Sequence, residues 1–332
     1  MPDPIRSEEQ SANAPPTGKA LRQCVVIAHR GASGYLPEHT LAAKAFAYAS
    51  GADYLEQDLV LTRDDKIIVL HDIHLDTVSN VAELYPTRKR EDGRYYAVDL
   101  DLAEIKKLDV HERVDLESGR AVFPKRFPLG KSTFRIPTLA EEIELVQGLN
   151  KSTGRSIGIY PEIKHPAWHR QQGKDISKIV LAELERYGYL DKNDAAFLQC
   201  FDAVETKRIR IELGCKLRII QLIAGDQNKS TPPLTPEGLI EIKSYADGVG
   251  PSMNQLIHQL DNKGTPVVAD WVQQAQNHGL NIHPYTFRAD ALPNYSESFE
   301  HLLEIFVGTA RIDGLFTDFP DQAAKYLDNL GD

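Results

Sequence analysis

The chain lacks any apolar run that approaches the roughly 18 to 20 residues needed to cross a bilayer. Its N-terminus also lacks the apolar core of a secretory signal, so residues 1–22 are predicted to be a flexible polar leader. The leader is either native or what remains after removal of a signal peptide, and the sequence leaves both origins open. We therefore expect no stable insertion into a membrane.

Cysteine is also scarce, and the chain carries no net positive charge. Cys24, Cys200 and Cys215 are odd in number and lack the spacing of a metal finger, which argues against a disulfide framework and favours buried thiols. Their disulfide status and redox compartment stay open. The net charge of −10 argues against a broad electrostatic surface for nucleic acid or anionic lipid, although a local cationic pocket could hold a phosphate. We expect a small-molecule substrate and no nucleic acid.

Apolar residues, by contrast, make up 42% of the 332 residues, enough for a large core. From Val25 onward, short β-rich runs alternate with amphipathic stretches of about 10 to 15 residues, which is typical of βαβ units and a parallel sheet. The expected strands are 24–30, 53–60, 66–72, 156–163, 195–201, 216–223, 247–252, 281–287 and 312–319. The second and third are too close for a crossover helix, so residues 53–72 are interpreted as a hairpin within the second βα unit. Eight units remain, which predicts an α/β fold, a TIM (β/α)8 barrel over residues 23–332.

The regular alternation stops after the third expected strand. Residues 73–136 carry a charge cluster, several turns and the aromatic pair Tyr95-Tyr96, and we predict that they form an inserted subdomain in the second βα unit. The carboxyl ends of barrel strands form the active face, so the insertion is expected over that face. Thr138, with Glu141 three residues on, predicts the start of the next helix.

The first expected strand ends in His29 and Arg30, and Gly31 and Gly34 allow the backbone to turn tightly after them. Arg offers paired donors to phosphate oxygens, and His exchanges protons near neutral pH. The pair suits phosphate chemistry at the barrel mouth. The alternative is a structural His beside a surface Arg.

Glu56 and Asp58 are two residues apart in an expected strand, so both carboxylates point to the same face, toward the barrel axis. Two buried like charges need a cation. Carboxylate oxygens suit Ca²⁺ or Mg²⁺, whereas zinc and copper favour His or Cys ligands. We therefore expect one divalent cation here, and a carboxylate pair bridged by Arg or Lys is the alternative.

Other expected strands end in polar residues as well. His71 follows the returning run of the hairpin, which brings a second His to the same rim, as a general acid and base pair requires. Glu162 and Lys164 offer a third carboxylate and a cation for phosphate. Each residue alone has a structural alternative, but together, at the carboxyl ends of barrel strands, they predict an active site.

A resemblance to the bacterial glycerophosphodiester phosphodiesterases rests on the segments HRGASGYLPEHT, YLEQDLVLTRDD, VLHD, YPEIKHP and DGLFTDFPD. The periplasmic branch is the most similar, through GADYLEQDLV, DGRYYAVDL, GIYPEIK, LQCFDA, YADGVGP and HPYTFR. The match runs from about Val25 to the C-terminus. It implies a barrel with an insertion in the second βα unit.

The resemblance also implies a role for each candidate residue. The roles are acid–base catalysis for His29 and His71, metal binding for Glu56, Asp58 and Glu162, phosphate binding for Arg30 and Lys164, orientation of Arg30 for Glu38, and lining of the glycerol pocket for Tyr285. His39 stands where most members have Asn, although the periplasmic branch shares the His, so its role is open. His165 and His169 match no motif, and solvated or capping roles are expected for them.

The implied activity is metal-dependent hydrolysis of glycerophosphodiesters, such as glycerophosphocholine or glycerophosphoethanolamine, to sn-glycerol 3-phosphate and an alcohol. Ca²⁺ is the preferred ion and Mg²⁺ the alternative. A periplasmic location is implied, with the cytoplasm left open, and a homodimer stays open. The rival functions are a phosphatidylinositol- or sphingomyelin-type phospholipase on the same barrel and a non-catalytic glycerophosphodiester-binding protein. The insertion, through Tyr95 and Tyr96, is expected to contact the glycerol end of the substrate; the alternative is a peripheral stabilising role.

Overall fold

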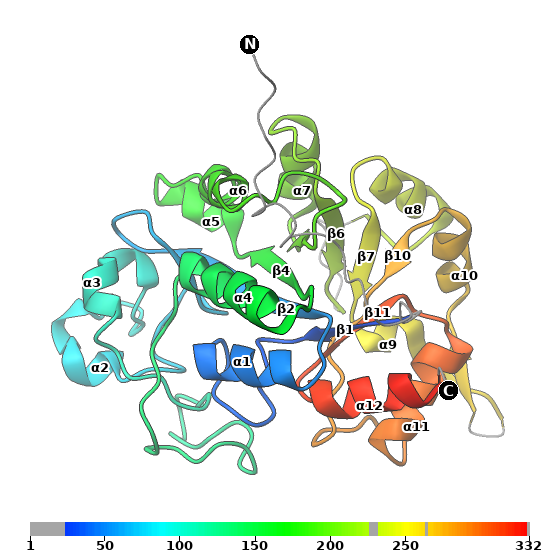
Figure 1. The fold of residues 1–332 in the computed structure, drawn as a ribbon, viewed down its shortest axis with the longest axis horizontal. Coiled ribbons are helices and arrows are strands. Elements are labelled where there is room, and N and C mark those ends of the chain that lie inside the picture. The colour runs from blue at the N-terminus through cyan, green and yellow to red at the C-terminus, as the bar shows by residue number, and fades with distance from the viewer. Residues whose placement is uncertain (1–23, 226–231, 263–264, 331–332) are drawn as a thin grey trace.

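A computed structural model of the protein describes residues 24–225, 232–262 and 265–330, so the predicted leader, residues 1–22, lies outside the described residues. Within them, a ring of eight parallel strands forms the centre of the molecule (Figure 1). The strands are β1 (Val25–Ala28), β2 (Tyr54–Leu61), β4 (Gly158–Ile163), β5 (Phe197–Cys200), β6 (Arg218–Ile223), β7 (Gly248–Pro251), β10 (Asn281–Ile282) and β11 (Gly314–Thr317). Their order around the ring is β10-β7-β6-β5-β4-β2-β1-β11.

Hydrogen bonds beside the two end strands, β10 and β11, bring the ring almost to closure. The backbone N–H of Phe287 donates to the carbonyl of Phe316 at 2.8 Å, and the N–H of Phe316 donates to the carbonyl of Pro284 at 3.1 Å. The Asp313 carboxylate accepts from the N–H of Ile282 at 2.8 Å. The predicted TIM barrel is confirmed.

The predicted hairpin is also present. Strand β3 (Ile67–Val69) pairs antiparallel with β2, with Leu59 opposite Val69 and Leu61 opposite Ile67. Each of the nine expected runs therefore contains a strand. The sequence did not predict a second small sheet, in which β8 (Ile257–Leu260) pairs antiparallel with β9 (Pro266–Val268).

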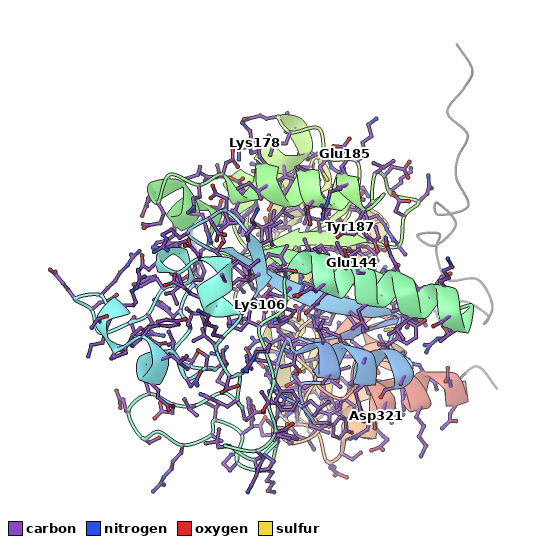
Figure 2. All side chains as sticks on the ribbon, turned by 60° about the vertical axis from the view of Figure 1, so that its left-hand side comes forward. Lys106, Glu144, Lys178, Glu185, Tyr187 and Asp321 are labelled. Carbon is purple, nitrogen blue, oxygen red and sulfur yellow. The ribbon has the colours of Figure 1, made fainter. Side chains whose placement is uncertain are left out.

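Helices form an outer layer around the ring (Figure 1). They are α1 (Leu41–Ala49), α4 (Leu139–Thr153), α5 (Pro166–Gln171), α6 (Ile176–Arg186), α7 (Ala203–Ile211), α8 (Pro236–Lys243), α9 (Met253–Leu256), α10 (Asp270–Asn277), α11 (Phe299–Leu303) with the π-helical η4 (Glu304–Thr309), and α12 (Pro320–Leu330). Helix α4 begins as predicted, because Thr138 and Glu141 each accept a hydrogen bond from the backbone N–H of the other, at 3.1 and 2.7 Å. Figure 2 shows Tyr187, which follows α6, beside Glu144 of α4, and its hydroxyl donates to Glu144 at 2.6 Å.

Two expectations from composition can be compared with the described residues. No helix among them combines the length and the apolar character that a membrane span needs. Cys24, Cys200 and Cys215 are all buried, so the expectation of buried thiols is confirmed.

Aromatic rings fill the inside of the barrel below the polar rim. The cluster consists of Ile27, Tyr54, Tyr160, Phe197, Ile220 and Phe316. The Tyr160 ring stacks on Phe197 at 4.9 Å and meets the edge of Phe316 at 5.0 Å. Along β2, Tyr54 belongs to this apolar layer, and Glu56 and Asp58 follow it toward the carboxyl end of the strand. The alternation of a barrel strand therefore places the carboxylates above an apolar floor.

Gly158, the first residue of β4, is required by the Tyr54 ring. A Cβ at this position would lie 2.2 Å from a ring carbon of Tyr54 and 2.6 Å from the carbonyl oxygen of Ala195. Gly158→Ala is therefore expected to lower the free energy of unfolding by about 1–3 kcal/mol, as overpacking does in a dense core. Urea unfolding at an unchanged m-value measures this.

Gly148 in α4 provides the matched control, because an added Cβ there meets no atom within 4 Å. Gly148→Ala should raise the stability by roughly 0.5–1 kcal/mol through helix propensity. Equal stability of Gly158→Ala and the unmodified protein would contradict the packing argument.

The segment between β3 and α4 lies to one side of the ring (Figure 1). It contains α2 (Val81–Leu84), η2 (Pro86–Arg88), η3 (Ala97–Asp99) and α3 (Leu102–Ile105). Its core joins Leu75, Val78, Val81, Tyr95, Leu100, Ile105 and Leu108 to Val60 and Ile68 of the hairpin, apart from the main core. Lys106, labelled in Figure 2, donates to the Ile136 carbonyl at 2.9 Å and pairs with Glu141 of α4. The bounds 73–136 for an inserted subdomain stay a prediction.

Candidate active site

A cavity of about 360 Å³ opens at the carboxyl ends of the barrel strands. The predicted site residues that line it are His29, Arg30, Glu56, Asp58, His71, Glu162, Lys164 and Tyr285. Glu38 is the exception and lies behind Arg30, whose guanidinium donates to it at 3.0 Å. The barrel thus brings together residues from β1, β2, β4 and the β3 hairpin at one rim.

Three buried carboxylates form one cluster in this cavity. Glu56 and Asp58 come from β2 and Glu162 from β4, where it pairs in register with Asp58. Each offers an oxygen within 4.8 Å of the others. Burial and the neighbouring Asp58 and Glu162 charges raise the pKa of Glu56 well above its usual value, and burial raises the pKa of Glu162 to about 8. Three such groups are costly to ionise together without a cation.

Two cations lie beside the cluster. Lys164 Nζ is 2.7 Å from Glu162 Oε1 and 3.5 Å from Asp58 Oδ1, and Arg30 Nε is 3.6 Å from Asp58 Oδ2. Although burial favours its neutral form, Lys164 and His71 hold the pKa of Asp58 well below its usual value. From the sequence, a carboxylate pair bridged by Arg or Lys was the alternative to a metal. Both cations are present, but they lie beside a cluster of three carboxylates that could also hold a metal ion.

The donor set fits a hard divalent cation. Its ligand atoms are all carboxylate oxygens, and Asp58 Oδ1 accepts no hydrogen bond from any described residue although it is buried. Gln199, which the sequence analysis did not single out although it lies in the quoted segment LQCFDA, also lines the cavity. Its amide donates to Glu56 Oε1 at 3.1 Å, and its buried Oε1 has no partner in the described part of the chain. A cation held here would have Glu56, Asp58 and Glu162 as ligands, with the Gln199 oxygen nearby.

Each of the two cavity histidines is bonded to an aspartate. His29 Nδ1 lies 2.6 Å from Asp318 Oδ1, and His71 Nδ1 lies 2.6 Å from Asp72 Oδ1. An ionised carboxylate only accepts, so each Nδ1 donates its proton and each Nε2 keeps a free lone pair. Burial, followed by the Arg30 charge, lowers the pKa of both imidazoles to about 4. Near neutral pH both Nε2 atoms can therefore accept a proton.

Asp72 and Asp318 were missed as functional residues, although both stand in quoted segments, VLHD and TDFPD. Asp72 directly follows His71, so adjacency was a usable signal. Asp318 follows β11, at the opposite end of the chain from His29, and only the closing of the barrel brings the two together.

A tight turn after β1 presents Arg30. Its φ of 57° is left-handed, and its backbone N–H donates to Glu56 Oε2 at 2.7 Å. Gly31 follows at φ 85°, where a Cβ would lie 2.9 Å from the backbone carbon of Ala43. The turn that the sequence predicted from its glycines thus ties the phosphate-binding candidate to a carboxylate of the cluster.

Three other histidines that the sequence analysis considered lie outside the cavity lining. His39 Nε2 is bonded to Asp58 Oδ2 at 2.7 Å, so His39 orients a carboxylate of the cluster. His165 is exposed, as expected. His169 differs from the expectation, because it is buried and its Nε2 accepts from the backbone N–H of Leu61 at 3.2 Å.

Among the aromatic candidates, only Tyr285 reaches the cavity. Its hydroxyl donates to the Ile223 carbonyl at 2.9 Å, and its ring meets Phe201 edge-on at 5.8 Å. Tyr95 is buried in the core of the segment after β3, and Tyr96 stacks on Trp168 at 5.5 Å. Neither lines the cavity, so the structure does not support the expected contact of these rings with glycerol.

Known proteins are similar to this chain in sequence and in architecture. The model of the glycerophosphoryl diester phosphodiesterase family matches residues 29–322. A glycerophosphodiester phosphodiesterase of Haemophilus influenzae is 43% identical over 328 residues, which cover 92% of this chain and 90% of the relative.

Solved structures share the fold. A structure from Silicibacter pomeroyi, assigned to the glycerophosphoryl diester phosphodiesterases, has a TM-score of 0.69 at 22% identity and covers 98% of each chain. An Oleispira antarctica phosphodiesterase, solved in complex with the product sn-glycerol-3-phosphate, has a TM-score of 0.62 at 18% identity and covers 92% of this chain and 96% of its own. Together with the match of the family model along most of the chain, these similarities show that the chain is an enzyme of the glycerophosphoryl diester phosphodiesterase family.

Proposed function

We propose that the enzyme hydrolyses glycerophosphodiesters such as glycerophosphocholine and glycerophosphoethanolamine to sn-glycerol 3-phosphate and an alcohol. His29 and His71 act as its general acid and base. One divalent cation, Ca²⁺ in preference to Mg²⁺, is held by Glu56, Asp58 and Glu162. The observation that carries the proposal is that two imidazoles, each hydrogen-bonded to an aspartate, lie in the same cavity as a buried cluster of carboxylates.

The charged residues of the cavity can bind a phosphodiester anion. Arg30 and Lys164 offer N–H donors to its free oxygens and neutralise its charge. A bound divalent cation supplies Lewis-acid polarisation of the phosphoryl oxygen. Tyr285 and Phe201 give the cavity an apolar wall, against which the carbon atoms of glycerol can pack.

The two imidazoles divide the proton transfers. One Nε2 accepts the proton of the nucleophile as its oxygen bonds to phosphorus, and the other donates a proton to the alcohol oxygen as its bond to phosphorus breaks. The nucleophile is water or the neighbouring hydroxyl of glycerol, which would give a cyclic phosphate that water opens. The negative charge of the bound substrate favours the protonated form of the imidazole that donates.

Similar proteins support the substrate class. The Oleispira structure holds sn-glycerol 3-phosphate as a product, and the Haemophilus relative is a glycerophosphodiester phosphodiesterase. The likeness of the quoted segments to the periplasmic branch supports a periplasmic location for the mature enzyme, and fractionation of the source cells tests this.

Turnover of glycerophosphocholine, coupled to detection of sn-glycerol 3-phosphate, tests the proposal directly. Equal amounts of choline and sn-glycerol 3-phosphate are expected, with no phosphocholine. Activity on diacyl lipid in vesicles without activity on glycerophosphocholine would instead identify a phospholipase. Binding of glycerophosphocholine without turnover would identify a binding protein.

A further inference from the structure

The segment between β3 and α4 reaches the site through Arg113, which lies behind His71. Its Nη1 donates to Asp72 Oδ2 at 2.6 Å, while the other oxygen of Asp72 bonds to His71. Its Nη2 and Nε donate to the two oxygens of Glu38, at 2.7 and 3.1 Å. The Arg113 side chain is only 17% exposed, so these bonds are largely shielded from water. The Arg113 guanidinium is therefore held in place behind His71 by hydrogen bonds to Asp72 and Glu38.

Arg126 of the same segment occupies the equivalent place behind His29. Its Nη2 donates to Asp318 Oδ2 at 2.7 Å, while the other oxygen of Asp318 bonds to His29. Its Nε donates to Asp290 at 2.8 Å, and its guanidinium lies over the Phe123 ring at 3.7 Å. With the side chain 5% exposed, Arg126 is more deeply buried than Arg113.

Both histidines thus have the same support, in which the imidazole bonds to one carboxylate oxygen and an arginine holds the other. A carboxylate fixed at both oxygens cannot rotate, so it keeps the imidazole plane and the Nδ1–H tautomer in place. We propose that Arg113 and Arg126 are positioning residues that align His71 and His29 for proton transfer. Residues 73–136 of this segment then act on catalysis from behind the histidines, since none of them lines the cavity. This inference rests on the proposed acid–base roles.

The two supports differ in strength. Asp318 also accepts from Arg288 Nε at 2.8 Å, so a second cation remains if Arg126 is replaced. Among the described residues, Asp72 has only the Thr77 hydroxyl as a further donor, at 3.0 Å. Arg113→Gln is therefore expected to lower kcat by roughly 10- to 100-fold, a range typical of outer partners of functional groups, and Arg126→Gln by less.

The decisive experiment compares two substrates. Glycerophosphocholine needs a proton on its leaving alcohol, whereas glycerophospho-p-nitrophenol releases a phenolate that leaves without one, so loss of the general acid matters little for the second. Of His29→Ala and His71→Ala, the variant that lacks the general acid should therefore lose activity mainly on glycerophosphocholine, and the variant that lacks the general base should lose activity on both substrates. Arg113→Gln is expected to follow the pattern of His71→Ala, and Arg126→Gln that of His29→Ala.

Arg94 supplies the matched control. It belongs to the same segment and pairs with both oxygens of Asp76, at 2.8 and 2.7 Å, but donates no hydrogen bond to Asp72 or Asp318. Arg94→Gln should leave both activities unchanged. If Arg113→Gln does not fold, Arg113→Lys, which keeps the charge, is measured in its place against the same pattern.

Double variants complete the test. In the His71→Ala background, Arg113→Gln should cause no further loss of kcat, because the residue it positions is already absent. Fully additive losses of kcat in the double variant would overturn the inference. It would also be overturned if Arg113→Gln and Arg126→Gln showed the same pattern of losses across the two substrates. A raised KM at unchanged kcat would also overturn it, and would place Arg113 with Glu38 and Arg30 in phosphate binding. Near-normal turnover of both alanine variants would instead reject the proposed acid–base roles, whatever the arginine variants do.

Discussion

Replacing His29 or His71 by alanine is expected to lower kcat for glycerophosphocholine by roughly 10²- to 10⁴-fold, because positioned proton transfer contributes about that much. The imidazoles themselves, not the carboxylate cluster, are removed, so metal binding should persist. Steady-state kinetics at saturating substrate, with calorimetric titration of Ca²⁺, separates the two effects.

His278 offers a control for the loss of an imidazole as such. It is exposed at the end of α10, so His278→Ala should keep full activity. The acid–base assignment fails if either cavity variant turns over glycerophosphocholine at a near-normal rate.

Exhaustive chelation is expected to reduce turnover by on the order of 10³-fold or more, because a Lewis acid contributes several kcal/mol at a phosphoryl centre. Without the cation, the cluster of Glu56, Asp58 and Glu162 offers the phosphoryl oxygen no Lewis acid. Adding back Ca²⁺ should restore more activity than Mg²⁺, since Ca²⁺ accepts carboxylate oxygens in a flexible geometry, whereas Mg²⁺ demands a near-ideal octahedron and gives up its water reluctantly.

Glu162→Gln tests the ligand set itself. It keeps the size of the side chain but removes one charge, so calorimetry should show weaker Ca²⁺ binding and activity that recovers only at higher Ca²⁺. Glu144→Gln, on the outer surface of α4, changes the net charge equally and should bind Ca²⁺ normally. Full-rate hydrolysis by the metal-free protein would refute a catalytic cation.

Most of the barrel could be predicted because its strands are short buried runs between helices, a pattern that sequence periodicity records directly. The β8–β9 hairpin could not, because its strands, Ile257–Leu260 and Pro266–Val268, are short and β9 is only partly buried. Such strands carry too little alternation to stand out from a loop.

The same distinction applies to the site. Glu56 and Asp58 were found because alternation along one strand fixes their direction. Arg113 and Arg126 stand among many other charged residues without local periodicity, and their partners are set by how a long segment packs on the barrel. The contact with glycerol that was predicted from the Tyr95-Tyr96 pair is not supported for a related reason. A pair of aromatic residues is as typical of a core as of a binding surface.

The bond between His29 and Asp318 spans 289 residues, beside the pairing of β1 with β11. Contacts between such distant residues form late in folding, because the entropy of closing the loop is lost before they stabilise it. During refolding, helical structure should therefore return before catalytic activity. On the ribosome, His29 emerges long before Asp318 and acquires this aspartate only when β11 has been made, so hydrolysis cannot begin before that strand has joined the barrel.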